Sequence, residues 1–191
     1  KSISSVVQEI VEGELLQMEK TKKLNLKEDD YFSIIKLKTA SLFKCAFEVG
    51  GISAQANLTQ INNLGSLGLI MGNIFQIKDD ILDYDESPFS GKSFGNDTRE
   101  GKINLPLLYA LKKMTLLEKN SIYRILRKKT NSQKEISLVK KGVLKYNGIE
   151  QAESIMNKNY DQAINLLQTF GENNYKKAVK LLLQFLMTRK K

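Results

Sequence analysis

The sequence predicts an all-α helical bundle. Apolar residues recur at a period of about 3.6 residues along most of the 191-residue chain, which indicates helices that bury one face. Only two prolines are present, and no segment shows the two-residue alternation of a β-strand. The hydrophobic content of 41% suffices for a substantial core, so we expect one folded domain over residues 1–191.

Two helices are predicted in the first part of the chain. The first spans residues 2–20, and a polar connection over residues 21–28 separates it from a second helix over residues 29–49. The pair Gly50-Gly51 is expected to end the second helix. The apolar residues at helical spacing on the first helix are Ile3, Val6, Val7, Ile10, Val11 and Leu15. The residues expected to face inward on the second helix are Tyr31, Ile34, Ile35, Leu42, Phe43, Ala46 and Phe47.

The third predicted helix, over residues 57–83, has the clearest chemical pattern. Because an α-helix turns by about 100° per residue, four polar residues spaced i, i+3, i+4 and i+7 share one face. These residues are Gln76, Asp79, Asp80 and Asp83. Gly65, Gly68 and Gly72 lie on or beside the same face, where each costs about 1 kcal/mol relative to alanine. We interpret them as a sign that this face needs open space.

The three carboxylates on this face predict a cation site. Like charges one turn apart destabilise a helix by roughly a few tenths of a kcal/mol, so a cation should compensate them. Oxygen ligands in a chain with no histidine and one cysteine suit Mg²⁺, which completes its shell with water and substrate phosphates. A solvated acidic face is the alternative, and the DDxxD pattern alone would favour it. The glycines and Gln76 shift the balance toward a site.

Residues 84–104 form the longest stretch without periodicity. A loop of this length in a compact domain is usually functional or disordered. It carries Lys92, Arg99 and Lys102 directly after the carboxylates, and a polyphosphate requires both cations and a metal–carboxylate face. A flexible linker is the alternative that composition alone favours.

The remainder of the chain predicts scaffold helices. Thr115 and Ser132 each stand three residues before a glutamate, so capping boxes should start helices at both positions. A further helix follows Gly148 and ends at Gly171. The last helix spans residues 174–187, and we expect the basic tail after it to be solvated.

The formal charge of +9 makes anions the expected partners. No basic motif interleaved with aromatic residues is present, so we expect no nucleic-acid partner. A single cysteine, Cys45, indicates that no disulfide framework exists and that the compartment is reducing, hence cytoplasmic. No signal peptide or 18-residue apolar run occurs, and peripheral contact with a membrane stays open.

Four motifs follow one another in a recognisable order. They are GELLQ at 13–17, KTA at 38–40, FQIKDDILD at 75–83 and GKSFGNDTREGKINLP at 91–106. Together they resemble the trans-isoprenyl (polyprenyl) diphosphate synthase family. The resemblance implies the isoprenoid synthase type of helical bundle, a homodimer and a Mg²⁺-dependent prenyltransferase. In that reaction an allylic diphosphate ionises and its carbocation alkylates isopentenyl diphosphate, which elongates a polyprenyl diphosphate.

The same resemblance implies a role for particular residues. The aspartates implied to act at the metal are Asp79, Asp80 and Asp83, which form the second aspartate-rich motif, and Asp97, which supports the metal and its water shell. Of these, Asp79 and Asp83 are the stronger candidates for direct contact. The residues implied to act on the substrate are Lys38, Lys92 and Lys102 for the diphosphate oxygens, Thr39 and Gln76 for the developing cation, and Phe75 for the cavity wall.

One departure from the family concerns its first aspartate-rich motif, which is followed by paired arginines upstream of GExxQ. The nearest match here is Glu28-Asp29-Asp30, with Ser33 in place of a third aspartate and no arginine pair anywhere. We therefore expect the C-terminal portion of a longer synthase, with the N-terminal half absent, which is inactive by itself. Asn104, where the family usually has threonine, is a minor exchange.

Two other functions stay open. A non-catalytic partner subunit of a heteromeric prenyl synthase would keep the helices and lose one metal site, although the retained DDILD sequence counts against it. A basic helical nucleic-acid-binding module is supported by the net charge alone, and it would bind with a steep dependence on salt and none on Mg²⁺.

Overall fold

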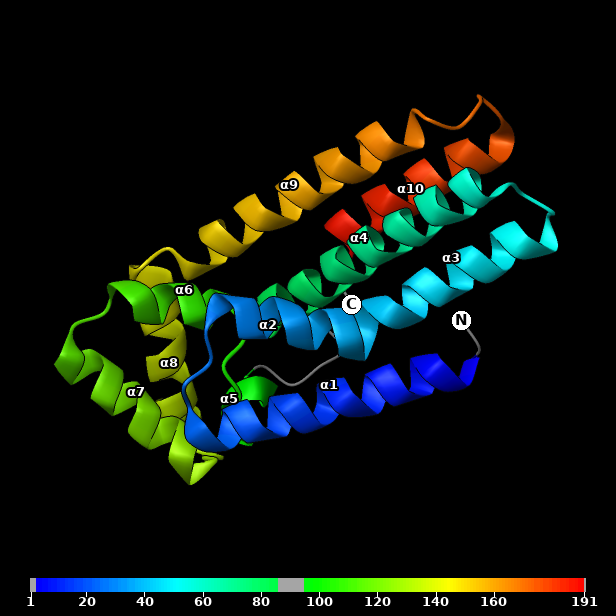
Figure 1. Ribbon diagram of the computed structural model, residues 1–191. Helices are drawn as coiled ribbons and strands as arrows, with labels where there is room; N and C mark the ends of the chain where they lie inside the picture. The colour runs from blue at the N-terminus through cyan, green and yellow to red at the C-terminus, as the bar shows by residue number, and fades with distance from the viewer. Residues whose placement is uncertain (1–2, 86–94, 191) are drawn as a thin grey trace. The chain divides into compact units, whose positions relative to one another are not determined.

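The structure is a computed structural model that describes residues 3–85 and 95–190 (Figure 1). These residues form ten α-helices and one π-helical turn, η1, and contain no β-strand. The elements are α1 (Ile3–Lys23), α2 (Glu28–Ile35), η1 (Lys36–Ala40), α3 (Ser41–Ser53), α4 (Leu58–Leu82), α5 (Asn96–Glu100), α6 (Leu105–Lys113), α7 (Leu116–Lys128), α8 (Gln133–Lys145), α9 (Gly148–Leu167) and α10 (Asn174–Thr188). The prediction of an all-α protein is confirmed.

The chain divides into two compact units. The first unit contains the chain up to Gln17 together with Phe32–Lys78 and Met156–Arg189. The second unit contains mainly Met18–Tyr31 and Asp79–Ile155. Each unit is assembled from segments that are distant in the sequence, and α1, α2, α4 and α9 each contribute to both. The single domain over residues 1–191 stays a prediction.

In the first unit, three glycines of α4 allow it to pack closely against η1 and α3. A Cβ atom at Gly68 would lie 2.7 Å from the carbonyl oxygen of Phe43, and one at Gly72 would lie 2.5 Å from the Cα atom of Ala40. Gly65 is in similarly close contact with a side chain of α3. The prediction that these glycines provide open space is therefore wrong. Gly68 and Gly72 let two backbones approach to a distance that any side chain would prevent.

The π-helical turn η1 changes which residues of α3 face inward. A π turn contains one more residue than an α turn, so the following residues are rotated by about 100° relative to an uninterrupted helix. Leu42 is 56% exposed and Ala46 is also exposed, whereas Phe43 and Phe47 are partly buried. The predicted inward orientation of Leu42 and Ala46 is thus wrong, while that of the two phenylalanines is consistent with the structure.

Three helices end at other residues than predicted. α1 continues to Lys23, three residues beyond its predicted end. α3 continues through Gly50-Gly51 to Ser53, because neither glycine adopts a positive φ and Gly51 packs against side chains of α4. α9 ends at Leu167, four residues before Gly171. The bounds of α4 and α10 lie within one or two residues of their predicted positions.

Only one of the two predicted capping boxes forms. At the start of α7, the Thr115 hydroxyl accepts the Glu118 N–H while the Glu118 carboxylate accepts the Thr115 N–H. Ser132 is the N-cap residue of α8, but its side chain makes no capping hydrogen bond. The Thr130 hydroxyl accepts the Ser132 N–H at 3.0 Å and donates to Glu135, so it replaces the predicted capping contact.

In the second unit, α6 is the most deeply buried helix. Seven consecutive residues, Leu105–Leu111, are buried. The sequence pattern did not indicate this helix separately, although Asn104 is a strong N-cap residue and Pro106 favours a first turn. The core around α6 combines residues from α6, α7 and α8 with three from outside them, namely Leu24, Tyr84, Leu107, Ala110, Leu111, Met114, Ile122, Ile125, Leu126, Val139 and Val143.

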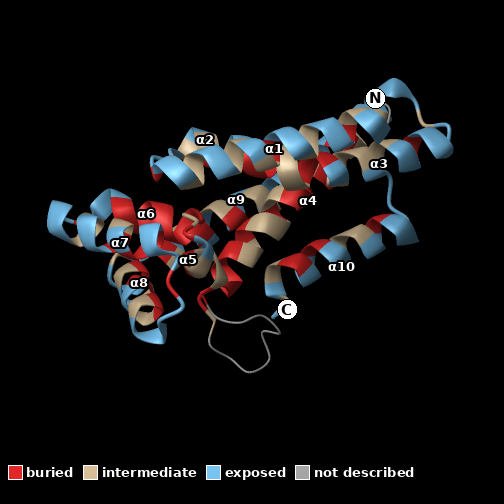
Figure 2. Cartoon of the chain, turned by 90° about the horizontal axis from the view of Figure 1, so that it is seen from below, coloured by how far each residue is buried: buried red, intermediate tan, exposed pale blue. Residues whose placement is uncertain are grey.

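The helix α1 exposes most of the apolar residues that were expected to pack. Figure 2 shows it largely as exposed or intermediate, and its buried residues are Val6 and Gly13. The apolar residues that are more than half exposed are Ile3, Val7, Val11, Leu15 and Met18. In the part of the chain that the structure describes, no helix is long and apolar enough to cross a membrane.

Candidate active site

The C-terminal end of α4 holds Asp80 in the interior of the second unit. Asp80 is 5% exposed, and its Oδ2 atom accepts hydrogen bonds from the Tyr31 hydroxyl at 2.8 Å and the Leu105 N–H at 3.0 Å. Burial, followed by the charge of Asp80, raises the pKa of Tyr31 well above its ordinary value, so the phenol keeps its proton and donates it. Asp80 therefore connects the start of α6 and a residue of α2 to α4.

Asp83 follows α4 directly and binds the first turn of α5. Its carboxylate accepts the Asn96 N–H at 2.9 Å and the Asp97 N–H at 3.3 and 3.4 Å to its two oxygens. Burial, followed by the neighbouring Asp97 carboxylate, raises the pKa of Asp83 to about 7. A cation between two such carboxylates would favour their charged forms.

Asn104 holds the Asp97 carboxylate in place. Its Nδ2 group donates to Asp97 Oδ2 at 2.8 Å, while its Oδ1 atom accepts the Tyr84 hydroxyl at 2.7 Å and the Leu107 N–H at 3.3 Å. An asparagine can do both because its amide is a donor and an acceptor. Sequence reasoning missed Tyr31 and Tyr84, and it treated Asn104 as a minor exchange. The signal for Asn104 was its position before Leu105-Pro106, where an N-cap residue is expected.

The aspartates at the end of α4 and the start of α5 are residues of the type that binds Mg²⁺. Among the described residues, no group of three or more acidic, histidine or cysteine side chains could hold a metal by itself. Mg²⁺, however, often takes only one or two carboxylates and fills its shell with water and phosphate oxygens. Asp83 and Asp97, which contact each other through the Asp97 N–H, have oxygen atoms of the kind that such an ion prefers, and Asp79 is partly buried. One oxygen of Asp80 accepts hydrogen bonds from Tyr31 and Leu105.

In the first unit, the GELLQ and KTA motifs contact each other. The Lys38 amine donates to Gln17 Oε1 at 2.7 Å and forms an ion pair with Glu14 Oε2 at 2.6 Å. A Cβ atom at Gly13 would lie 2.7 Å from the Lys38 nitrogen of the backbone, so the glycine allows α1 to approach η1. The two motifs thus fix the position of one lysine, which lies in the π-helical turn.

Thr39, the next residue of η1, contacts the glutamine of the FQIKDDILD motif. Its hydroxyl donates to Gln76 Oε1 at 2.9 Å. This contact fixes the orientation of the glutamine side chain. It also occupies the hydroxyl proton, which leaves lone pairs on Thr39 Oγ1 that can face a positive charge.

Phe75 contacts one aromatic neighbour, Phe43, and one cationic neighbour, Arg189. Its ring lies 5.5 Å from that of Phe43, and the guanidinium of Arg189 lies 4.3 Å from its centroid. Arg189 also donates to the Phe75 carbonyl oxygen at 3.0 Å. The expectation of a solvated basic tail is therefore wrong for Arg189, because a guanidinium can stack on a ring and bond a carbonyl at the same time.

Lys102 and the acidic residues of the first turn of α2, Glu28, Asp29 and Asp30, lie apart from these motif contacts. Lys102 is partly buried and pairs with Glu100, while Lys92 lies outside the described residues. Glu28 accepts the Tyr109 hydroxyl at 2.8 Å and pairs with Lys112. Asp30, in the same run, pairs with Lys20 at 2.9 Å. These contacts give the acidic run a structural role.

The structure organises seven of the predicted residues into two groups. The carboxylates Asp80, Asp83 and Asp97 are organised within the second unit, and Lys38, Thr39, Gln76 and Phe75 are organised within the first. The family profile described as polyprenyl synthetase matches residues 1–143 of the chain. The chain belongs to the polyprenyl synthetase family.

Relatives within the polyprenyl synthetase family have names that describe diphosphate synthases. The chain is 33% identical over 186 residues to a geranylgeranyl diphosphate synthase of Saccharolobus solfataricus, covering 95% of the chain and 55% of the relative. It is 30% identical over 178 residues to an octaprenyl diphosphate synthase of Escherichia coli, covering 93% and 55%.

A solved structure in the polyprenyl synthetase family confirms the fold. A polyprenyl synthase of Caulobacter crescentus, crystallised with calcium and isoprenyl diphosphate, matches with a TM-score of 0.92 and 30% identity. The match covers 99% of this chain and 58% of that one. The helical bundle is therefore of the isoprenoid synthase type. The chain spans a little more than half the length of the relatives that it matches.

Proposed function

We propose that this chain supplies the second aspartate-rich motif of a trans-polyprenyl diphosphate synthase. Such an enzyme condenses an allylic diphosphate with isopentenyl diphosphate. The observation that carries the proposal is the organised group of carboxylates in the second unit. Backbone N–H groups fix Asp83, Asn104 fixes Asp97, and buried contacts fix Asp80. This arrangement supports binding of a diphosphate through Mg²⁺ in a chain of the polyprenyl synthetase family.

In this proposal the aspartates divide into ligands and an anchor. Asp79, Asp83 and Asp97 would hold Mg²⁺, whose charge would stabilise the diphosphate that leaves the allylic substrate. Asp80 would keep the end of α4 in position through Tyr31 and Leu105 instead of binding the ion. Asn104 would keep the Asp97 carboxylate oriented by donating one hydrogen bond to it.

The substrate-binding residues would act as charges and dipoles. Lys38 would bind diphosphate oxygens, and Glu14 and Gln17 would hold its amine in position. Lys92 and Lys102 would bind the same group. Thr39 and Gln76 would turn oxygen atoms toward the developing carbocation, and their mutual hydrogen bond reduces the cost of orienting them. Phe75 would contribute an apolar wall that excludes water.

The same proposal includes the length and the oligomeric state of the complete enzyme. Relatives are nearly twice as long as the matched part, and the chain lacks a paired-arginine motif. We propose that the chain corresponds to the C-terminal portion of a synthase and that the complete enzyme is a homodimer. The chain by itself would bind diphosphate but not elongate a prenyl chain.

Calorimetric titration tests the metal-binding proposal directly. Inorganic pyrophosphate is titrated into the purified chain with and without Mg²⁺, so that binding is measured without turnover. Asp79→Asn and Asp83→Asn should each weaken Mg²⁺-dependent binding by about tenfold or more, since a charged ligand is lost. Asp161→Asn, an exposed aspartate of α9, is the matched control and should bind like the parent chain.

The same titration separates a ligand from an anchor. Asp80→Asn should lower the free energy of unfolding more than it lowers pyrophosphate affinity. Binding that is equally strong without Mg²⁺, or unchanged in Asp79→Asn and Asp83→Asn, would contradict the assignment of the metal ligands.

A further inference from the structure

The net positive charge of the chain is confined to one segment. Residues 112–145 contain eleven Lys and Arg and only two acidic residues, Glu118 and Glu135, which gives a formal charge of +9. The rest of the chain contains nineteen basic and nineteen acidic residues and is therefore neutral. A charge asymmetry of this size indicates a surface for anionic partners more strongly than an evenly spread excess does. None of the proposed catalytic residues lies in this segment.

The segment forms the end of α6 followed by α7 and α8, all within the second unit. Some of its cations have acidic partners, since Lys112, Lys128 and Lys145 form ion pairs with Glu28, Glu135 and Glu118. Exposed cations that make no ion pair within the described residues include Lys113, Arg124 and Arg127. The surface therefore keeps a large uncompensated positive charge.

Two leucines are exposed in the middle of this charge. Leu116 and Leu117 are 77% and 82% exposed at the start of α7, between Lys112-Lys113 and Lys119. The capping box of Thr115 and Glu118 fixes the backbone around both leucines. Exposed leucines among lysines leave apolar surface in contact with water, and a partner with an apolar interior could bury that surface.

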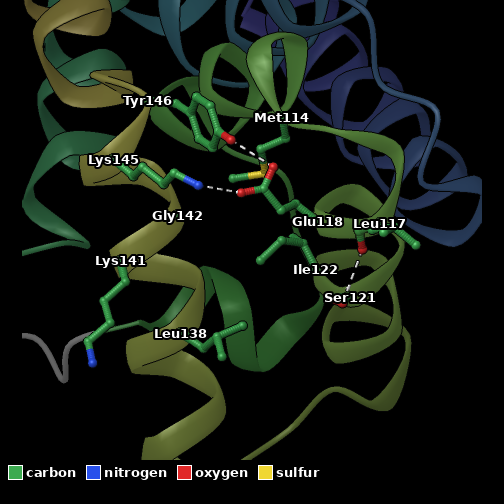
Figure 3. A pocket seen from close by; sticks show the side chains of 10 residues that line it. All are labelled: Met114, Leu117, Glu118, Ser121, Ile122, Leu138, Lys141, Gly142, Lys145 and Tyr146. Carbon is green, nitrogen blue, oxygen red and sulfur yellow. Dashed lines mark hydrogen bonds and ion pairs between the residues drawn. The ribbon is translucent and has the colours of Figure 1, made fainter.

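A groove between α7 and α8 continues this apolar surface. Its volume is about 360 Å³, and Met114, Ile122 and Leu138 provide apolar lining (Figure 3). Gly142 keeps α8 from filling the groove, because a Cβ atom there would lie 2.8 Å from the Met114 methyl group. At one side of the groove, the Glu118 carboxylate accepts hydrogen bonds from Lys145 at 2.6 Å and Tyr146 at 2.7 Å. The groove therefore combines an apolar floor with a polar, partly cationic rim.

We propose that the surface formed by residues 112–145 docks onto an anionic lipid bilayer, with Leu116 and Leu117 inserted at the interface. Lysines and arginines would face the lipid headgroups, and the two leucines would enter the acyl region. This combination of cationic and apolar side chains is that of peripheral membrane contacts. A nucleic acid fits less well, because exposed leucines have no partner on a phosphate backbone. The proposal does not depend on the catalytic assignment.

Vesicle sedimentation of the full chain tests the proposal. Binding is measured to vesicles of phosphatidylcholine alone and to vesicles that also contain phosphatidylglycerol. We expect binding to the anionic vesicles only. The double variant Leu116→Ser/Leu117→Ser should reduce it by about tenfold or more, from the lost burial of two side chains. Lys113→Glu should reduce it by about fivefold or more.

Matched controls distinguish binding through this surface from nonspecific binding to vesicles. Leu58→Ser replaces a leucine of α4 that is 74% exposed outside the cationic segment, and Lys158→Glu reverses an exposed lysine of α9. Lys158→Glu changes the net charge as much as Lys113→Glu does. Both controls should bind like the parent chain, and circular dichroism should show unchanged helix content in every variant.

Three results would overturn the proposal. The first is a lack of binding to anionic vesicles at low salt. The second is an equal loss of binding in the Leu58→Ser and Lys158→Glu controls. The third is vesicle binding that the leucine variant leaves unchanged and that RNA displaces, which would identify a nucleic acid as the better partner. Pyrophosphate binding by the leucine variant should stay at the parent level, so failure of this proposal is distinguishable from failure of the catalytic one.

Discussion

At the scale of single residues, buried hydrogen bonds of the second unit orient the carboxylates Asp80 and Asp97. Tyr31, Tyr84 and Asn104 donate to or accept from groups that lie among Asp80, Asp83 and Asp97. Neither the two tyrosines nor Asn104 had been predicted to contribute to the site. A sequence pattern reports which face of a helix a residue occupies, but it does not report which distant donor reaches a given carboxylate.

Removal of the Tyr31 hydroxyl should destabilise the fold. In Tyr31→Phe the buried Asp80 carboxylate loses one of its donors, and we expect a loss of about 1–3 kcal/mol in the free energy of unfolding. Urea unfolding measures the change. Tyr175→Phe, at a tyrosine that is 84% exposed, should leave the unfolding curve unchanged. Equal stability of the two variants would show that the Tyr31 contact contributes nothing.

Glu118 should make stability depend on pH in the acid range. Hydrogen bonds from Lys145, Tyr146 and Thr115 lower the pKa of Glu118 from 4.5 to about 2 in the folded chain. The ionised Glu118 carboxylate therefore stabilises the fold fully above its pKa in the unfolded chain, and this stabilisation is lost as the pH falls from about 4.5 to about 2. In Glu118→Gln this contribution is absent. The difference in unfolding free energy between parent and variant should be constant above about pH 5 and should shrink toward pH 2, and a difference that is constant throughout would contradict the assignment.

At the scale of helices, the bounds of an element could be predicted where a local sequence pattern alone defines it. The bounds of α4 were predicted within a residue or so, and the capping box at Thr115 formed as expected. The π-helical turn η1 was not predictable, because it changes the hydrogen-bonding register without any proline or glycine within Lys36–Ala40. The glycines of α4 were misinterpreted, since a gap in a side-chain face and a close approach of two backbones look identical in a sequence.

The close packing of α4 against η1 gives a prediction at the same scale. Gly72→Ala would place a Cβ atom 2.5 Å from the Ala40 Cα, so the backbones must separate, and we expect a loss of roughly 1–3 kcal/mol. Gly50→Ala is the matched control, because nothing lies within 4 Å of its Cβ position and alanine favours a helix by about 1 kcal/mol. Thermal unfolding should thus move in opposite directions for the two variants. A stabilised Gly72→Ala would contradict the packing described here.

At the scale of the whole molecule, the four motifs predicted the family correctly, and the family profile over residues 1–143 confirms it. Within the first unit, the structure also shows contacts between motifs that the sequence could only place in order. Lys38 meets Glu14 and Gln17, and Thr39 meets Gln76. The exposed apolar face of α1 could not be predicted, because an amphipathic pattern shows that a face is apolar without showing what covers it.

The last prediction concerns catalysis, and it depends on which charged residues are available to compensate two diphosphates. Ionisation of an allylic diphosphate requires compensation of a polyanionic leaving group, and binding of isopentenyl diphosphate adds a second polyanion. The acidic run nearest to a first metal motif is engaged elsewhere, since Glu28 contacts Tyr109 and Lys112 while Asp30 contacts Lys20. We therefore expect Mg²⁺-dependent pyrophosphate binding without turnover. Radiolabelled isopentenyl diphosphate, incubated with an allylic diphosphate, Mg²⁺ and a preparation of verified intact mass, measures this directly. Elongated product that is lost in Asp83→Asn would show that these residues suffice for catalysis and would contradict the prediction.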